Sequence, residues 1–152
     1  MFRLISEKDK EIFLKYTYDF YQSDVVFAPV PQEICESTFT ELMRSNQYLE
    51  CYIFEEDNSP CGYALISKTF SPEAGGLSIT YEELYLEEKS RNKGYMSEFF
   101  DYIRNKYKAA RYRIEVENEN EEAKRLYIRQ GFMELPYIQM VDDSWRKNHE
   151  ES

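Results

Sequence analysis

Hydrophobic residues recur every three or four positions in several stretches of the chain, a spacing typical of helices with one buried face. The pattern predicts helices over about residues 7–22, 31–43, 96–108 and 121–130. Ser6 with Asp9, and Asn118 with Glu121, have the spacing of capping boxes that begin the first and last of these helices. Gly131 is typical of the residue that follows a helix.

Elsewhere, apolar and polar residues alternate, which predicts strands with one buried face. The predicted strands are residues 2–5, 48–55, 61–70, 77–86, 111–117, 132–135 and 137–142. The polar stretch 56–60 separates two of them and predicts a hairpin turn. Hairpins followed by alternating strands and helices predict an α/β fold with a mixed, mostly antiparallel sheet flanked by helices.

The alternation slips by one residue in the strand at 77–86. Leu77, Ile79 and Tyr81 are apolar at odd positions, whereas the pattern after residues 82–83 continues at even positions with Leu84. A one-residue slip in a period-two pattern is what a β-bulge produces, and bulges are common beside active sites. The alternative is a regular strand in which Tyr85 keeps the original phase.

The chain has 152 residues, 42% of them hydrophobic and 16% aromatic, which is a core-forming composition and not that of a disordered chain. We expect a single domain over residues 1–145, followed by a polar tail over residues 146–152. No apolar run approaches the roughly 18 residues of a membrane span, and the N-terminus lacks the pattern of a signal peptide. Three cysteines without metal-site spacing favour reduced thiols, so we expect a cytoplasmic protein.

The formal net charge of −10 disfavours binding to nucleic acid and favours a cationic partner, or else serves only solubility. The only histidine is His149, close to the end of the chain. This excludes Ser-His-Asp and Cys-His catalysis and a zinc site with paired histidine ligands. We expect no metal, and proton transfer must use carboxylates, tyrosines, cysteines, lysines, the backbone or water.

A tight polar loop with Arg91, Lys93 and Gly94 joins the strand at 77–86 to a helix that begins near Met96. The first N–H groups of a helix lack partners and carry positive potential, so such a junction can bind an anion. Taken alone, the loop does not identify an anion-binding site, because polar loops with one glycine precede many helices.

A second motif lies one strand further on, in the series N-x-x-A-x-x-L-Y-x-x-x-G-F formed by Asn120, Ala123, Leu126, Tyr127, Gly131 and Phe132. Together with the loop it resembles the GNAT superfamily of acyl-coenzyme A-dependent N-acyltransferases. The phosphate loop of that superfamily is R/Q-x-x-G-x-G/A, and Arg91, Gly94 and Met96 fill its defined positions, with Met in place of Gly or Ala. The resemblance implies a sheet whose fourth and fifth strands splay apart.

The resemblance also implies a role for each site residue. Main-chain groups of Leu84, Tyr85 and Leu86 would pair with the pantetheine arm of acetyl-CoA. The loop amides would hold its pyrophosphate, and they belong to Arg91, Asn92, Lys93, Gly94, Tyr95 and Met96. Asn120 would bind the pantetheine or the main chain at the splay. Tyr127 would protonate the leaving thiolate, and Glu82 or Glu83 would take a proton from the amine.

Each of these roles has a structural alternative. Tyr127 also fits an apolar helical face, Asn120 also fits a helix cap, and Glu82 and Glu83 also fit an exposed strand. We therefore expect an acetyltransferase acting on a primary amine, with a small cationic acceptor. The rival hypothesis is an acyl-CoA-binding sensor or interaction module without turnover, because Asn92 and Met96 depart from the usual loop. A homodimer remains open.

Overall fold

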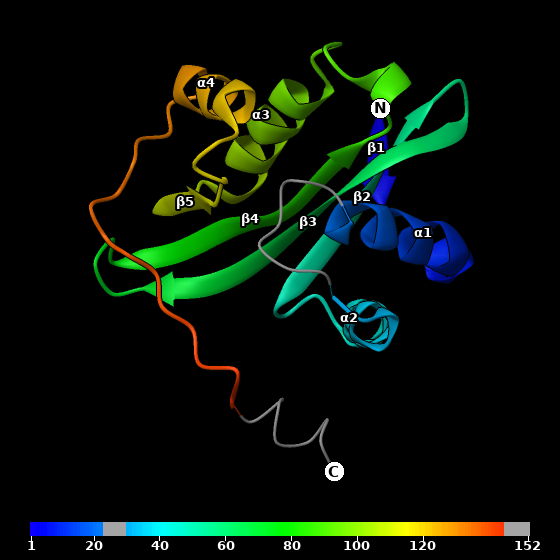
Figure 1. Ribbon diagram of the computed structural model, residues 1–152, viewed down its shortest axis with the longest axis horizontal. Coiled ribbons are helices and arrows are strands. Elements are labelled where there is room, and N and C mark those ends of the chain that lie inside the picture. Colours follow the sequence, from blue (N-terminus) through cyan, green and yellow to red (C-terminus); the bar gives the residue numbers. More distant parts are fainter. Residues whose placement is uncertain (23–29, 145–152) are drawn as a thin grey trace.

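The computed structural model describes residues 1–22 and 30–144, and in this part of the chain helices cover both faces of one sheet (Figure 1). The helices are α1 (Lys10–Tyr21), α2 (Gln32–Arg44), α3 (Tyr95–Tyr107) and α4 (Glu121–Arg129). The strands are β1 (Phe2–Leu4), β2 (Leu49–Glu56), β3 (Ser59–Ser71), β4 (Gly76–Leu86) and β5 (Arg111–Ile114). Short 3₁₀ turns at Glu7–Asp9 and Glu88–Ser90 precede α1 and α3.

The described strands form a five-stranded sheet in the order β1-β2-β3-β4-β5. Neighbours are antiparallel from β1 to β4, and β5 is parallel to β4. The β2–β3 hairpin turns at Asp57 and Asn58, whose φ values of 52° and 62° are typical of tight hairpin turns. The mixed, mostly antiparallel sheet predicted from the sequence is therefore confirmed.

The two faces of the sheet have separate apolar cores. Helices α1 and α2 cover one face, where Phe13, Phe39 and Ile53 are buried. Helix α3 covers the other face, where Phe54, Phe99, Phe100, Ile103 and other residues are buried. Both helices α1 and α3 carry these side chains at helical spacing, as the sequence predicts.

The predicted bulge in β4 is confirmed. Leu65 of β3 lies opposite Glu83, whereas the next residue, Ile66, lies opposite Tyr81, so Glu82 has no partner in the ladder. The extra residue changes which side chains face each core. Tyr81 and Leu84 pack on the α3 side, while Glu83 contacts α1 on the opposite side.

The start of the chain is held by the predicted capping box. The backbone N–H of Ser6 donates to Asp9 Oδ2 at 2.8 Å. Arg3 of β1 donates to both carboxylate oxygens of Asp9 at 2.8 and 2.9 Å, and this guanidinium lowers the pKa of Asp9. The strand β1 and helix α1 are thereby fixed to each other.

Three expectations about secondary structure are wrong. The segments 132–135 and 137–142 form no strands; they are mostly exposed and have no neighbouring strand, and Pro136 lacks the N–H that a ladder requires. The strand at 111–117 ends at Ile114, because the chain leaves β4 there. Pro31 is the N-cap of α2 and not its first helical residue.

The predicted polar tail, residues 146–152 with His149, lies outside the described residues. Among the residues that are described, no helix has the length and apolarity to cross a membrane. Within the same residues, no group of three or more His, Cys, Asp or Glu side chains is placed to hold a metal ion.

Candidate active site

A small open cleft of about 60 Å³ lies where β4 and β5 diverge. The two strands pair only from Ser78 and Arg111 to Tyr81 and Ile114, so their later residues splay apart as expected. The lining includes Tyr81, Glu82, Leu84, Ile114, Asn120 and Tyr127. The cleft therefore brings the bulge, the start of α4 and the tyrosine of the second motif to one place.

The last three residues of β4, at 84–86, offer one free edge to this cleft. On one side they pair with β3, whereas β5 no longer pairs with them on the other. The close approach to β3 requires Gly62, because a Cβ there would lie 2.3 Å from the carbonyl oxygen of Tyr85. A ligand with amide groups in an extended chain can add to such an edge as a further strand does.

The loop before α3 has the backbone of an anion site. Asn92 and Gly94 both have left-handed conformations, with φ values of 61° and 83°. Gly94 is the N-cap of α3, so the first N–H groups of the helix are available to a ligand. Met96 packs against the apolar core beneath α3, so its side chain does not fill the loop.

Glu56 at the end of β2 fixes this loop and was missed by the sequence analysis. Its carboxylate accepts hydrogen bonds from Lys93 at 2.6 Å, from Ser90 at 2.8 Å and from Tyr95 at 3.1 Å. Lys93, followed by Ser90, lowers the pKa of Glu56 to about 2. No local pattern marks Glu56, because its partners lie 34 or more residues further along the chain.

Both basic side chains of the loop thus have partners within the protein. Lys93 binds Glu56, and Arg91 Nε donates to the carbonyl oxygen of Leu86 at 2.8 Å. The guanidinium of Arg91 also lies 6.0 Å from the ring centroid of Tyr85. An anion in this loop would be held chiefly by main-chain N–H groups.

We expect Glu56→Gln to lower the melting temperature at neutral pH, because a neutral amide accepts weaker bonds from Lys93. Because the pKa of Glu56 is lower in the folded protein, the ionised carboxylate stabilises the fold above its unfolded pKa of 4.5. This stabilisation is lost as the pH falls toward 2. The difference in melting temperature between wild type and variant should therefore shrink between pH 5 and pH 2. A difference that stays constant over this range would contradict the assignment.

Asn120 both caps α4 and lines the cleft. Its side-chain oxygen accepts a hydrogen bond from the N–H of Ala123 at 3.1 Å. The prediction that Asn118 caps this helix is wrong, because Asn120 lies three residues before that N–H and Asn118 does not. The amide nitrogen of Asn120 makes no hydrogen bond to another described residue and can donate to a ligand.

Tyr127 lies on the wall of the cleft formed by α4. Its ring packs edge-on against Phe100 and Phe132, with centroids 6.2 and 6.1 Å away. Burial raises the pKa of Tyr127 above its ordinary value, so the hydroxyl keeps its proton at neutral pH. Tyr127 thus both packs on the core through its ring and lines the cleft, so this geometry fits the core interpretation as well as the catalytic one.

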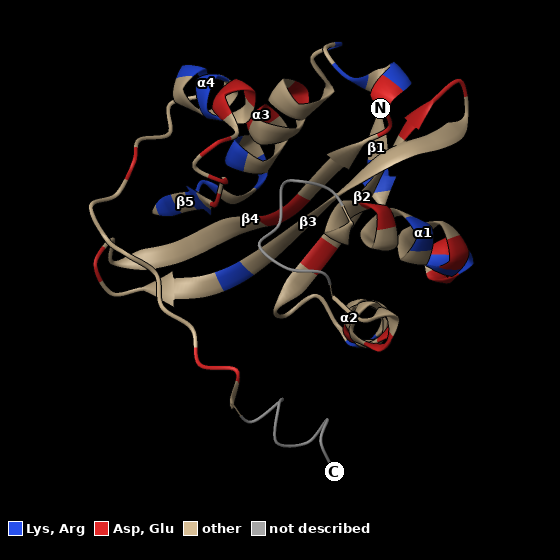
Figure 2. Ribbon diagram, in the orientation of Figure 1, with Lys and Arg blue, Asp and Glu red and all other residues tan. Residues whose placement is uncertain are grey.

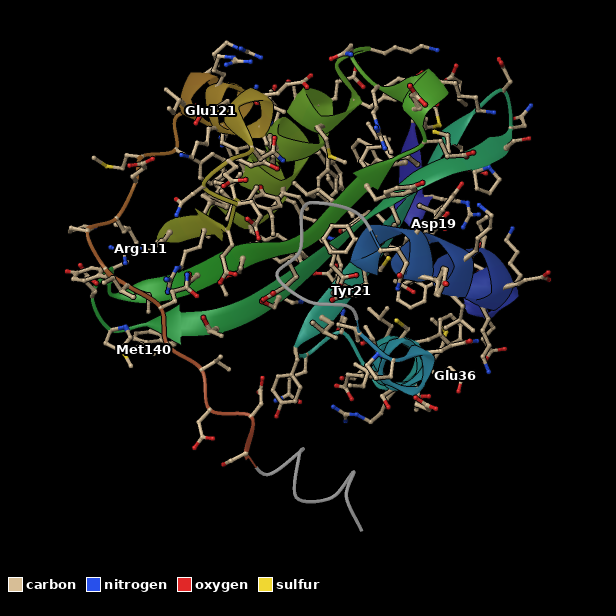
Figure 3. The ribbon with its side chains drawn as sticks, viewed as in Figure 1. Asp19, Tyr21, Glu36, Arg111, Glu121 and Met140 are labelled. Carbon is tan, nitrogen blue, oxygen red and sulfur yellow. The ribbon has the colours of Figure 1, made fainter. Side chains whose placement is uncertain are left out.

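The bulge separates the two neighbouring glutamates. Glu82 lines the cleft, and one of its oxygens accepts a hydrogen bond from Ser67 at 2.6 Å. Glu83 is buried on the opposite face of the sheet, where Tyr63 and Tyr21 donate to its two oxygens at 2.7 and 2.9 Å. Tyr21 lies at the end of α1 that faces this strand (Figure 3).

Burial raises the pKa of Glu83, although the two tyrosine hydroxyls act in the opposite direction. Both of its oxygens are occupied, and it does not line the cleft. The cleft therefore contains one of the two glutamates proposed as bases, together with Tyr127 and Asn120.

Several solved structures share the fold over nearly the whole chain. A possible acetyltransferase from Clostridium difficile 630 superposes with a TM-score of 0.80 at 17% identity, covering 94% of this chain and 96% of its own. A predicted acetyltransferase with acetyl-CoA from Clostridium acetobutylicum has a TM-score of 0.75 at 17% identity, with 93% and 95% covered. AAC(6')-Iy, in complex with the bisubstrate analogue CoA-S-monomethyl-acetylneamine, has a TM-score of 0.77 at 12% identity, with 94% and 97% covered.

At these identities the structural matches show the fold. No curated protein matches the sequence. The sequence model of the acetyltransferase (GNAT) family matches residues 14–132, which is more than half of the chain and includes the loop and the second motif. The chain therefore belongs to the GNAT family of acetyl-CoA-dependent N-acetyltransferases, as its motifs predict.

Proposed function

We propose that this protein transfers the acetyl group of acetyl-CoA to the primary amine of a small cationic acceptor by direct attack. The observation that carries the proposal is the cleft between β4 and β5. A free strand edge, a carboxylate at the bulge and a protonated tyrosine meet there. A loop with the backbone of an anion site follows the same strand edge.

The cofactor would lie along this edge and loop. The pantetheine amides would pair with main-chain groups of residues 84–86, and Asn120 would donate its side-chain N–H to the same arm. The pyrophosphate would accept hydrogen bonds from N–H groups of residues 91–96. This arrangement holds the acetyl group at the bulge, where β4 and β5 separate. Such positioning can lower the barrier by about 7–11 kcal/mol in favourable cases.

The reaction removes two protons from the ammonium nitrogen and adds one proton to the leaving sulfur. The amine is protonated at neutral pH, and Glu82 takes its proton directly or through one water. The amine nitrogen then attacks the thioester carbonyl carbon, a C–N bond forms, the C–S bond breaks, and the nitrogen loses its second proton to water. Glu82 releases the first proton to solvent. Tyr127 gives its proton to the departing thiolate, and solvent then returns a proton to Tyr127.

The charge of the cleft supports a cationic acceptor. Its lining includes the carboxylates of Glu82, Glu115 and Glu117 and contains neither Lys nor Arg among the described residues. The bend after β5 that carries two of these carboxylates is acidic in Figure 2. A second ammonium group on the acceptor would be attracted to these side chains, while an anionic acceptor would be repelled.

Acetyl-CoA at about 100 times its dissociation constant is expected to stabilise the fold by about 2.7 kcal/mol. For a domain of this size, the melting temperature rises by roughly 5–11 °C. Release of free CoA with a panel of diamines, neutral amines and amino acids then tests turnover and acceptor class. Binding without turnover on any amine would favour the sensor hypothesis. The absence of a thermal shift at millimolar acetyl-CoA would refute both the acetyltransferase and the sensor hypotheses.

We expect Gly94→Val to weaken CoA binding at least tenfold, which is about 1.4 kcal/mol. The φ of 83° strongly disfavours a β-branched residue, and the added Cβ would enter the open space that the phosphates need. The matched variant Met96→Ala should change the affinity little, because that side chain packs on the core. Calorimetry on both variants checks this, and tighter binding by Met96→Ala would mean that methionine blocks the loop.

A further inference from the structure

The loop before α3 carries main-chain donors without partners. The N–H groups of residues 92–94 make no hydrogen bond to another described residue. Asn92 and Gly94 have left-handed backbones, and such residues turn successive N–H groups toward one concave side, where an anion can bind. A left-handed backbone is uncommon for any residue except glycine, so the shape at Asn92 needs support from elsewhere in the fold.

That support comes from the carboxylate of Glu56, at the end of β2. One of its oxygens accepts a hydrogen bond from Lys93, and the other accepts hydrogen bonds from Ser90 and Tyr95. These donors lie before, between and after the two left-handed residues, so one side chain holds the loop at three points. The acidic end of β2 that carries this carboxylate is coloured in Figure 2.

A carboxylate is an unexpected neighbour for a site that binds phosphates. Its negative charge repels them, and it engages the ammonium group of Lys93, which would otherwise attract them. On charge alone, Glu56 therefore lowers the affinity of the loop. Its three hydrogen bonds act in the opposite direction, because a loop that is ordered before the ligand arrives does not have to be ordered by binding. The alternative is that Glu56 serves only the fold, since a negative charge near the N-terminus of α3 is favourable.

We propose that Glu56 is a positioning residue for acetyl-CoA, which raises the affinity by holding the N–H groups of residues 92–94 in the shape that the pyrophosphate needs. It touches no part of the ligand, and Lys93 acts through Glu56 and not on the phosphates. This inference rests on the proposed binding of acetyl-CoA but not on turnover. The affinity then depends on the β2–β3 hairpin, which lies outside both sequence motifs of the family.

Calorimetry of the Glu56→Gln protein with CoA tests the sign of the effect. Glutamine keeps one oxygen to accept from Ser90 and Tyr95 but turns an NH₂ group toward Lys93. By charge alone, the loss of a carboxylate and the release of Lys93 would both tighten binding. Positioning predicts instead that the dissociation constant of CoA rises roughly three- to tenfold. An unchanged or tighter affinity would overturn the proposal.

Glu56→Asp provides a second variant that keeps the charge. Its side chain is one methylene shorter and cannot reach all three donors, so CoA should again bind more weakly than to wild type. An affinity equal to that of wild type would show that the position of the carboxylate does not matter, and it would contradict the proposal.

Glu55→Gln is the matched control. Glu55 is the preceding residue of β2, its side chain is 28% exposed against 24% for Glu56, and it accepts a hydrogen bond from Arg3 of β1 at 3.0 Å. Its replacement should also lower the melting temperature but leave the affinity for CoA unchanged. If Glu55→Gln weakens CoA binding as much as Glu56→Gln does, Glu56 contributes only to general stability.

Steady-state kinetics separate positioning from chemistry. In the Glu56→Gln protein, KM for acetyl-CoA should rise while kcat at saturating acetyl-CoA stays within about twofold of wild type, because the loop holds the cofactor equally in the bound state and in the transition state. A loss of kcat with an unchanged KM would contradict this role.

The double variant Glu56→Gln with Lys93→Met tests whether Lys93 acts through Glu56. Its dissociation constant for CoA should match that of Glu56→Gln within about twofold, because both changes break the same contact. Losses that multiply would mean that Lys93 contacts the phosphates directly, against the proposal. Wild type that binds no CoA would refute the proposed function together with this inference, whereas binding without turnover would refute only the proposed catalysis.

Discussion

Tyr127→Phe is expected to lower kcat by roughly 10²- to 10⁴-fold while KM for acetyl-CoA changes little. The hydroxyl acts only when negative charge develops on the leaving sulfur. Its loss therefore raises the free energy of the transition state and not that of the enzyme–substrate complex. The ring still packs against Phe100 and Phe132, so the fold should tolerate the change. Burial, which raises the pKa of Tyr127, ensures that wild type carries the proton to be donated.

Tyr112→Phe is the matched control for this experiment. Tyr112 also packs against the core beneath α3, but its hydroxyl accepts a hydrogen bond from the N–H of Ala109 at 3.0 Å and does not line the cleft. We expect a small loss of stability and a nearly unchanged kcat. If Tyr127→Phe behaves in the same way when chemistry limits the rate, Tyr127 is only a core residue.

Glu82→Gln should reduce kcat/KM by roughly 10²- to 10⁴-fold and remove the acidic limb of the pH–rate profile. Glutamine keeps the hydrogen bond with Ser67 but cannot take a proton from the amine. An acceptor of higher intrinsic acidity, which is already neutral at the assay pH, should recover part of the lost rate. Initial rates between pH 5 and 9 measure both effects.

Glu83→Gln, one residue away, separates proton transfer from support of the fold. Glu83 is held by Tyr63 and Tyr21 on the far side of the sheet, so its replacement should leave the acidic limb in place. Its pKa is raised by burial, so its contribution to stability is present at low pH and declines as the pH rises through the folded value. If the acidic limb of the pH–rate profile survives in Glu82→Gln but disappears in Glu83→Gln, Glu83 is the base and Glu82 is not.

Much of the fold follows from local patterns. The bulge at Glu82 was predicted because a period-two pattern cannot shift phase without an extra residue. The left-handed backbone at Asn92 and the helix end at Gly131 follow from the side chains that these conformations tolerate. These features depend on a few neighbouring residues, so the sequence alone contains the information.

Local patterns in the sequence predicted only some of the residues of the candidate site. The series from Asn120 to Phe132 identified the family, and the resemblance placed Tyr127 and Asn120 at one site, where both line the cleft. The sequence left Glu82 and Glu83 equivalent. Only their positions relative to Ser67 and Tyr63 separate them, and those contacts join β4 to β3 across 15 and 20 residues of chain.

The sequence by itself determined the order of the helices and of the strands as far as Ile114, the bulge and the family, because each is encoded in the spacing of nearby side chains. Tertiary structure alone decided that Glu56 holds the loop before α3, that Asn120 and not Asn118 caps α4, and that 132–142 forms no strand within one chain. Glu56 acquires its role from groups brought together by the sheet. A strand likewise needs a hydrogen-bonded neighbour, and alternation of side chains cannot specify whether that neighbour is present.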